Sequence, residues 1–138
     1  MTRIIQTTTP GKERTYFSKA IVVTIRELLR QKAPDHNTQD MLAFIILALE
    51  EIASGIDQSV AAWEKRDYWV KADKYRMQWR WTGEVAKILK IAFKKENWKE
   101  ITSLLVEVMG NFKDIKVSDR HRMGKPWLGA HEKYLKEK

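Results

Sequence analysis

Residues 38–66 read TQDMLAFIILALEEIASGIDQSVAAWEKR and form the longest periodic apolar stretch in the chain. The apolar residues recur at steps of four, three, four, four and three, which places them on one helix face: Ile45, Leu49, Ile52, Ile56, Val60 and Trp63. Asn37 or Thr38 is expected to cap this helix, because either side chain can accept a bond from a free backbone N–H. The first half, MLAFIILAL, is apolar nearly all round, so we expect it at the centre of the fold.

The segment before this helix predicts another helix, from Thr9-Pro10 to about Lys32. Proline suits the first helical position because a backbone N–H at that position has no acceptor within the helix, so its absence in proline costs nothing. The inner face is expected to carry Phe17, Ile21, Thr24, Ile25 and Leu28. Residues 1–8 are rich in β-branched side chains but have no second strand to pair with, so we interpret them as an extended N-terminal arm.

The boundary after residue 66 has two interpretations. No Gly or Pro lies between Glu64 and Lys74, so the central helix could continue into the next one. A continuous helix would place Asp67 and Lys74 on the apolar seam, and it would be far longer than the usual length of roughly ten to fourteen residues. We therefore predict a break at residues 66–69, after which the chain turns back.

An antiparallel register follows from that turn. The inner stripe of the returning helix is predicted to be Met77, Trp81, Val85, Ile88 and Ala92, facing Val60, Ile56, Ile52, Leu49 and Ile45 in that order. The same register places Asp57 opposite Arg80 and Glu50 opposite Lys87. A second apolar stripe on the same helix predicts a further neighbour: Tyr75, Trp79, Ala86, Leu89 and Phe93.

The rest of the chain predicts one more long helix, which starts at Asn97-Trp98. Residues 117–138 form a basic tail that can hold a short last helix. Together these segments predict an all-α, up-and-down four-helix bundle with a short extra C-terminal helix, whose single domain covers residues 9–116.

Charge and composition limit the functional classes. The chain has 138 residues, a formal net charge of +8 and no cysteine, which excludes disulfides and thiolate zinc sites and favours a cytoplasmic location. Residues 34–62 carry five acids and no Lys or Arg, so we expect part of the basic charge to be neutralised within the fold. No apolar run is long enough for a bilayer, and the N-terminus lacks a signal-peptide pattern.

Catalytic patterns are weak. The three histidines lie in a turn or in the tail, and none is at helical spacing from another ligand. No nucleophile–base pair, phosphate loop or Glu-x-x-His pattern occurs, so we expect no metal, cofactor, small-molecule ligand or enzymatic activity. Arg30 and His36 form an Arg-x5-His pair that resembles the Arg-x(4–6)-His element of the HEPN family of helical ribonucleases. That resemblance covers two residues and implies a remote alternative, a ribonuclease-like helical protein.

The segment Trp63 to Trp81, WEKRDYWVKADKYRMQWRW, interleaves aromatic and cationic residues. Trp63, Met77 and Trp81 keep helical phase with the core, which favours a structural role for them. Tyr68, Trp69 and Trp127 have no such phase and are candidates for an exposed or partner-covered surface. The candidate residues for partner or nucleic-acid binding are Arg66, Tyr68, Trp69, Arg76, Arg80, Lys87, Lys90, Lys94 and Trp127.

Two main hypotheses fit these candidate residues. The first is a non-catalytic interaction module that acts as a homo-oligomer or as a subunit of a larger assembly. The alternative is a nucleic-acid-binding bundle, since aromatic rings can stack on bases and neighbouring cations can meet phosphates. The sequence favours the first hypothesis, because most of the aromatic residues have a structural explanation.

Overall fold

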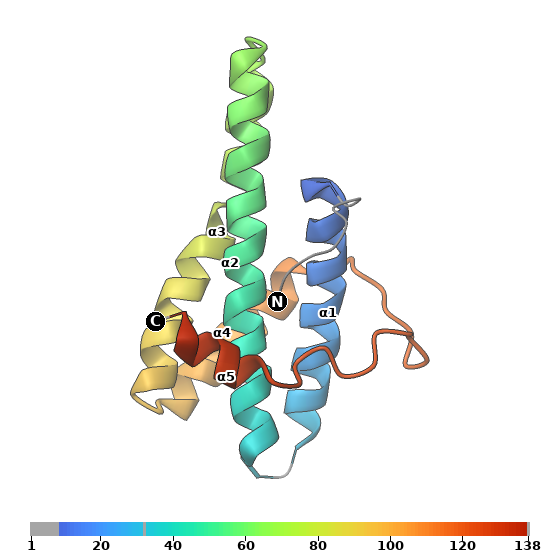
Figure 1. The fold of residues 1–138 in the computed structure, drawn as a ribbon, viewed down its shortest axis with the longest axis vertical. Helices are drawn as coiled ribbons and strands as arrows, with labels where there is room; N and C mark the ends of the chain where they lie inside the picture. The colour runs from blue at the N-terminus through green and yellow to red at the C-terminus, as the bar shows by residue number, and fades with distance from the viewer. Residues whose placement is uncertain (1–8, 32, 138) are drawn as a thin grey trace.

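The computed structural model describes residues 9–31 and 33–137 and is all-α (Figure 1). Its helices are α1 (Pro10–Arg30), α2 (His36–Lys65), α3 (Trp69–Lys94), α4 (Trp98–Asn111) and α5 (Ala130–Lys136). Four long helices and a short C-terminal one confirm the predicted bundle, and the described residues contain no strand. The predicted arm of residues 1–8 lies outside the described part of the chain.

Helix α2 is the central element, in contact with α1, α3 and α5 (Figure 1). Its first half is buried all round, as its apolar sequence predicted, and Leu42, Ile45, Ile46 and Leu49 are fully buried. The predicted stripe continues as far as Val60, which is also buried. The core of the bundle therefore extends along α2 from Leu42 to Val60, with its largest fully buried side chains in the first half of the helix.

The start of α2 differs from the prediction. Asp35 is the N-cap residue, and its carboxylate accepts bonds from the N–H groups of Asn37 and Thr38. The Thr38 hydroxyl in turn accepts a bond from the N–H of Asp35, which completes a capping box. The Asp35 carboxylate reaches the N–H groups two and three residues downstream, so Asn37 and Thr38 lie inside the helix instead of capping it.

Helix α2 ends at Lys65 and α3 begins at Trp69, as predicted. Asp67 adopts a left-handed backbone conformation (φ 63°), and the N–H of Tyr68 donates to the carbonyl of Trp63. The α3–α4 turn has the same geometry, with Glu96 left-handed (φ 52°) and the N–H of Asn97 donating to Ala92. Both turns are Schellman motifs that use an acidic residue where glycine is usual.

The predicted antiparallel packing of α2 and α3 is present, but the register is wrong by about one turn. Glu50 pairs with Lys90 (3.0 Å) instead of Lys87, and Arg76 pairs with Glu64 (2.6 Å). The pairing of Asp57 with Arg80 is not among the salt bridges of the described residues.

The inner face of α3 also differs from the prediction. Met77 and Ile88 are exposed, and the buried residues of α3 are Ala72, Thr82, Val85, Ala86, Leu89 and Ala92. A Cβ built on Gly83 would lie 3.6 Å from the Cβ of Ala53 on α2. Small side chains let the two helix backbones approach closely, so α3 turns its small residues toward α2 and its larger ones away.

The C-terminal tail packs on the bundle. Trp127, expected on an exposed or partner-covered surface, is buried between Val23 of α1 and Met41 of α2. Helix α5 then crosses α2 (Figure 1), and the N–H of His131 donates to the carboxylate of Asp40 (3.0 Å). Trp127 precedes α5 and follows an irregular segment, so helical phase could not reveal that its indole fills a gap between α1 and α2.

Candidate interaction surface

The α2–α3 hairpin projects beyond the other helices (Figure 1). We call residues 60–78 the hairpin end. This end is braced by contacts between its own two helices, among them Val60 and Ala72, which are buried. The rings of Trp63 and Tyr75 meet edge to face with centroids 4.7 Å apart. The hairpin end therefore has a defined shape although only two helices form most of it.

Charged side chains add to this brace. Arg76 forms salt bridges with Glu64 and Asp73, and hydrogen bonds from the guanidinium to Glu64 and then to Asp73 raise the pKa of Arg76. The ammonium of Lys71 lies 4.5 Å from the ring centroid of Trp63, within the range of a cation–π contact. Arg76 is thus engaged with two carboxylates of the hairpin itself.

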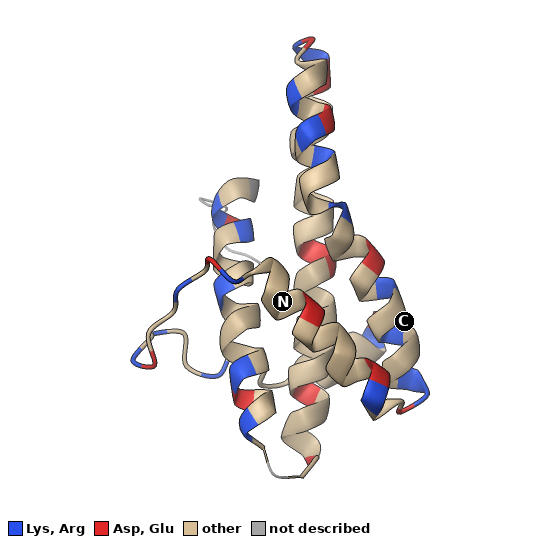
Figure 2. Cartoon of the chain, turned by 180° about the vertical axis from the view of Figure 1, so that it is seen from behind, with Lys and Arg blue, Asp and Glu red and all other residues tan. Residues whose placement is uncertain are grey.

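Four large apolar side chains are more than half exposed at the hairpin end: Tyr68, Trp69, Val70 and Met77. Arg66 lies beside them in the turn and is also exposed. The hairpin end holds five Lys or Arg residues and three Asp or Glu residues, and Figure 2 shows basic and acidic positions intermixed there. The structure therefore brings together three candidate residues, Arg66, Tyr68 and Trp69, and adds Val70 and Met77, which the sequence had not indicated.

The basic row on α3 divides into paired and unpaired residues. Lys90 forms a hydrogen bond with Glu50, which raises the pKa of Lys90, and its ammonium lies 6.0 Å from the ring centroid of Tyr134. Burial also raises the pKa of Tyr134. Arg80, Lys87 and Lys94 are exposed and form no ion pair within residues 9–31 and 33–137.

Arg80 and Lys87 line a shallow groove of about 420 Å³ between α2 and α3. The small residues Ala53 and Gly83 form part of its lining, and Asp57 lies in the same groove. The groove thus mixes charges of both signs, so the two cations are partly screened on this side of α3. Lys94 lies further along the helix, outside the groove.

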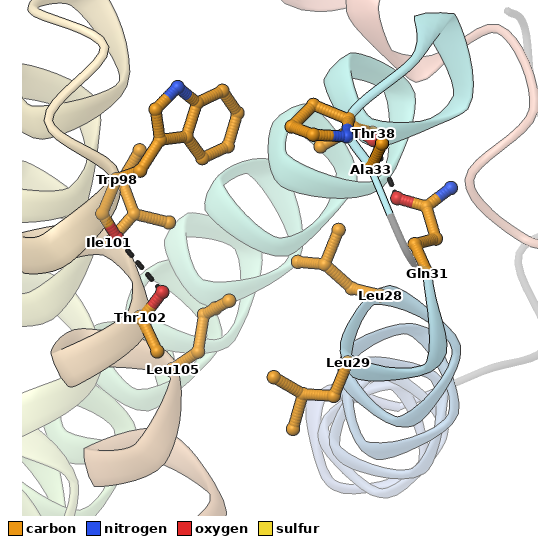
Figure 3. Close-up of a pocket in the computed structure, with 10 residues that line it drawn as sticks. Leu28, Leu29, Gln31, Ala33, Thr38, Trp98, Ile101, Thr102 and Leu105 are labelled. Atoms are coloured by element: carbon orange, nitrogen blue, oxygen red, sulfur yellow. Dashed lines mark hydrogen bonds between the residues drawn. The ribbon is translucent and has the colours of Figure 1, made fainter.

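An apolar cleft separates the end of α1 from α4 (Figure 3). Its volume is about 140 Å³, and Leu28, Leu29, Trp98 and Leu105 contribute to its walls. The hydroxyl of Thr38 donates to the side-chain oxygen of Gln31 (2.6 Å) at its edge. None of the lining residues is titratable, so the cleft offers neither an acid nor a base.

The Arg30–His36 pair does not form a site with this cleft. Arg30 forms salt bridges with Glu27 (3.1 Å) and Asp119 (3.3 Å). His36 is the first residue of α2 and is exposed. Neither residue lines the cleft of Figure 3. Arg30 therefore forms ion pairs at the surface, and His36 is an exposed residue at the start of α2.

Across the described ranges, no three His, Asp or Glu side chains are arranged to hold a metal ion. None of the described helices is both long and apolar enough to span a membrane. Comparison with protein-family models, with curated proteins and with solved structures gives no match. The exposed surfaces of the hairpin are thus the main basis for a functional argument.

Proposed function

We propose that the protein is a non-catalytic interaction module, which joins copies of itself or a larger assembly through the hairpin end. The observation that carries this proposal is the cluster of exposed apolar side chains on a projecting, braced hairpin. Tyr68, Trp69 and Val70 follow one another at the tip, and each is at least 53% exposed. Contiguous exposed apolar side chains at one place are typical of interaction surfaces.

Two properties of the hairpin end favour association: its exposed apolar surface area and the contacts that already order its backbone. Burying Trp69, Val70 and Tyr68 against a partner would remove a large apolar area from water, which is the main driving force of association. The frame is already ordered by the Trp63–Tyr75 contact and the Glu64–Arg76 ion pair, so binding does not have to order the backbone. A protein without cysteine is also suited to the reducing cytoplasm, where we place this module.

Light scattering across a range of protein concentrations tests self-association. We expect the wild-type chain to form a discrete oligomer and the Trp69→Ser plus Val70→Ser variant to be a monomer with unchanged helical circular dichroism. Leu128→Ser is the matched control, because Leu128 is as exposed (63%) but lies far along the chain, near α5. Equal masses for the wild type and the double variant would contradict a role of the hairpin end in self-association.

If the wild-type chain is a monomer, a second experiment tests whether the hairpin end binds another protein of a larger assembly. Tagged wild-type and double-variant proteins would be purified from the native cell under identical conditions. A stoichiometric companion that is present with the wild type and the Leu128→Ser control, and absent with the double variant, would support the proposal. The same companion on all three proteins would contradict it.

Nucleic-acid binding is the second candidate function. The observation in its favour is the exposed rings of Tyr68 and Trp69 next to Arg66, since aromatic rings and cations together suit single strands. A salt titration with fluorescent single-stranded RNA and DNA tests it. Phosphate binding should weaken steeply between about 50 and 200 mM salt, whereas an apolar interface should change little.

A further inference from the structure

The outer face of α3 carries a second exposed apolar surface, which shares Met77 with the hairpin end. We call Met77, Trp81, Glu84, Ile88 and Ile91 the outer stripe, because they recur at steps of four, three, four and three. Met77 is 69% exposed, Ile88 44% and Ile91 55%. Trp81 is half-buried, with its ring 5.1 Å from that of Phe112. The stripe is thus an apolar row, interrupted once by Glu84, in which Met77, Ile88 and Ile91 are exposed and Trp81 is partly covered by Phe112 at the end of α4.

The spacing of the outer stripe is that of a coiled-coil seam. Alternating steps of three and four keep side chains on the line along which two helices pack. From Met77 to Ile91 the stripe extends for about 21 Å along α3, which is three turns or more. This length fits one partner helix lying along α3. The stripe is linear, whereas the exposed residues of the hairpin end are grouped around a turn.

One edge of the outer stripe is entirely basic. Arg80, Lys87 and Lys94 follow each other at intervals of seven residues, and each lies three residues after a member of the stripe. They are the three cations of α3 identified above as unpaired. The other edge contains Val85 and Ala92, which are buried within the bundle. A helix on the stripe would therefore meet one edge of three cations, two of which, Arg80 and Lys87, also border the groove that contains Asp57 and Glu84.

We propose that the outer stripe binds an amphipathic helix of a partner protein whose apolar seam is flanked by Asp or Glu. The proposal rests on the interaction-module function and names the partner class for a second face of the hairpin. Acidic residues of the partner would pair with Arg80, Lys87 and Lys94, while its apolar seam would cover Ile88 and Ile91. Edge charges of this kind determine which helices pair in coiled coils.

The charge pattern disfavours the other occupants. A second copy of α3 packed on the outer stripe would bring its own three cations toward Arg80, Lys87 and Lys94. The like charges of two paired helices would then repel each other. A nucleic acid would use the cations but would gain little from Ile88 and Ile91, which are aliphatic and cannot stack on a base as an aromatic ring does. An acidic-edged helix would use both the aliphatic side chains of the stripe and the cations of its edge.

Glu84 makes the proposal more specific. It occupies the centre of the stripe, between Arg80 and Lys87 in the same groove, and an apolar partner residue laid over it would remove its carboxylate from water. A partner with Lys or Arg at the facing seam position would satisfy Glu84. A single polar seam residue can fix the register of a helix pair. The expected partner therefore combines acidic edges with one basic residue in the middle of its seam.

Synthetic peptides test this inference with the full chain. The probe is a helix of about three heptads with Leu at the seam positions, one central Lys and Glu at both edges. The matched control has the same seam and Lys at both edges. We expect fluorescence anisotropy to show saturable binding of the acidic-edged peptide and at least about tenfold weaker binding of the control, because the lysines of the control would lie next to Arg80, Lys87 and Lys94.

Three variants, each checked for folding by circular dichroism, complete the test. Ile91→Ser with Met77→Ser should abolish binding of the acidic-edged peptide. Reversing Arg80, Lys87 and Lys94 to Glu should exchange the preference, so that the basic-edged peptide binds instead. The exchange keeps the inference testable even if the serine variant proves unstable, because these three cations are exposed and make no ion pair within the described residues.

Several outcomes would overturn the inference. Equal affinity for both peptides would show that the basic edge selects nothing. Tight binding of single-stranded nucleic acid would also overturn it, if the charge reversal abolishes that binding and the serine variant retains it. Arg80, Lys87 and Lys94 would then bind phosphates. The Trp69→Ser plus Val70→Ser variant separates the two proposals: it should bind the peptide normally, so a loss of self-association there concerns the hairpin end alone.

Discussion

The two ends of the α2–α3 hairpin differ in what surrounds them. At the base, α2 is enclosed by α1, α3 and α5, and Leu42, Ile45 and Leu49 are fully buried. At the hairpin end the helices are held mainly by each other, through Val60, Ala72 and a few aromatic and ionic contacts. The same pair of helices therefore forms the core of the fold at one end and an exposed surface at the other.

The largest expected effect comes from removing a core side chain at the base. Leu49→Ala should lower the free energy of unfolding by about 4 kcal/mol, because the enclosed site cannot collapse around the cavity. Val60→Ala, near the hairpin end, should cost only about 1.5 kcal/mol, since it removes less apolar volume. Urea denaturation measures both values. Equal losses would break the distinction between the two ends.

Tryptophans in the two regions give the next comparison. Trp127 is buried against α1 and α2, so Trp127→Ala should cost about 3 kcal/mol and loosen the tail. Trp69 is 55% exposed, and Trp69→Ala should cost less than about 0.5 kcal/mol. Trp127→Phe is a useful control, because it keeps an aromatic ring and removes an indole N–H that has no partner among the described residues.

The two Schellman turns allow the same change at both ends. Glu96→Gly at the base should raise the free energy of unfolding by about 1 kcal/mol, because a left-handed conformation is costly for Glu and free for Gly. Asp67→Gly at the hairpin end should gain less, since Asp tolerates this conformation better. A larger gain at Asp67 than at Glu96 in chemical denaturation would contradict this ranking.

Most of the helical architecture could be predicted from sequence, because apolar periodicity reports helix faces directly. The break near residue 67 was predictable because a continuous helix would have buried Asp67 and Lys74. The exposure of Tyr68 and Trp69 was predictable for the related reason that they fall out of phase with the core. These inferences need only the local sequence of α2 and α3.

The register of α3 could not be predicted in the same way, because two apolar stripes on one helix compete for the same neighbour. Apolar size favoured Met77, Trp81 and Ile88 as the inner stripe, but backbone approach at Ala53 and Gly83 favours the smaller face. The outer stripe was missed as an exposed surface for this reason. Its basic edge was visible in the sequence, yet its importance depends on which face of α3 is turned outward.

The helix starts of the two regions lead to a pH prediction. α2 begins at the base with the Asp35 capping box, whereas α3 begins at Tyr68 without a side-chain cap. Burial alone would raise the pKa of Asp35, but hydrogen bonds from the N–H groups of Thr38 and Asn37 and from Gln31 lower it below its ordinary value. The stabilisation is therefore present above the ordinary aspartate pKa and is lost as the pH falls through the lowered value.

Asp35→Ala should accordingly lower the Tm by a few degrees at neutral pH. The difference from the wild type should shrink as the pH falls below the ordinary pKa of an aspartate, because the wild-type carboxylate then also becomes protonated. Thermal denaturation followed by circular dichroism measures both effects. A constant difference across this pH range would show that the ionised cap is not the cause.

The smallest effect on stability is expected where the proposed effect on binding is largest. Trp69→Ser plus Val70→Ser removes two large apolar side chains from the first turn of α3, where serine is well tolerated. Because both side chains are mostly exposed, the free energy of unfolding should change by less than about 0.5 kcal/mol. A loss above about 1.5 kcal/mol in urea denaturation would mean that these residues support the fold. Unchanged stability together with lost association would show that apolar area of the same chemical kind stabilises the bundle at one end of the hairpin and binds a partner at the other.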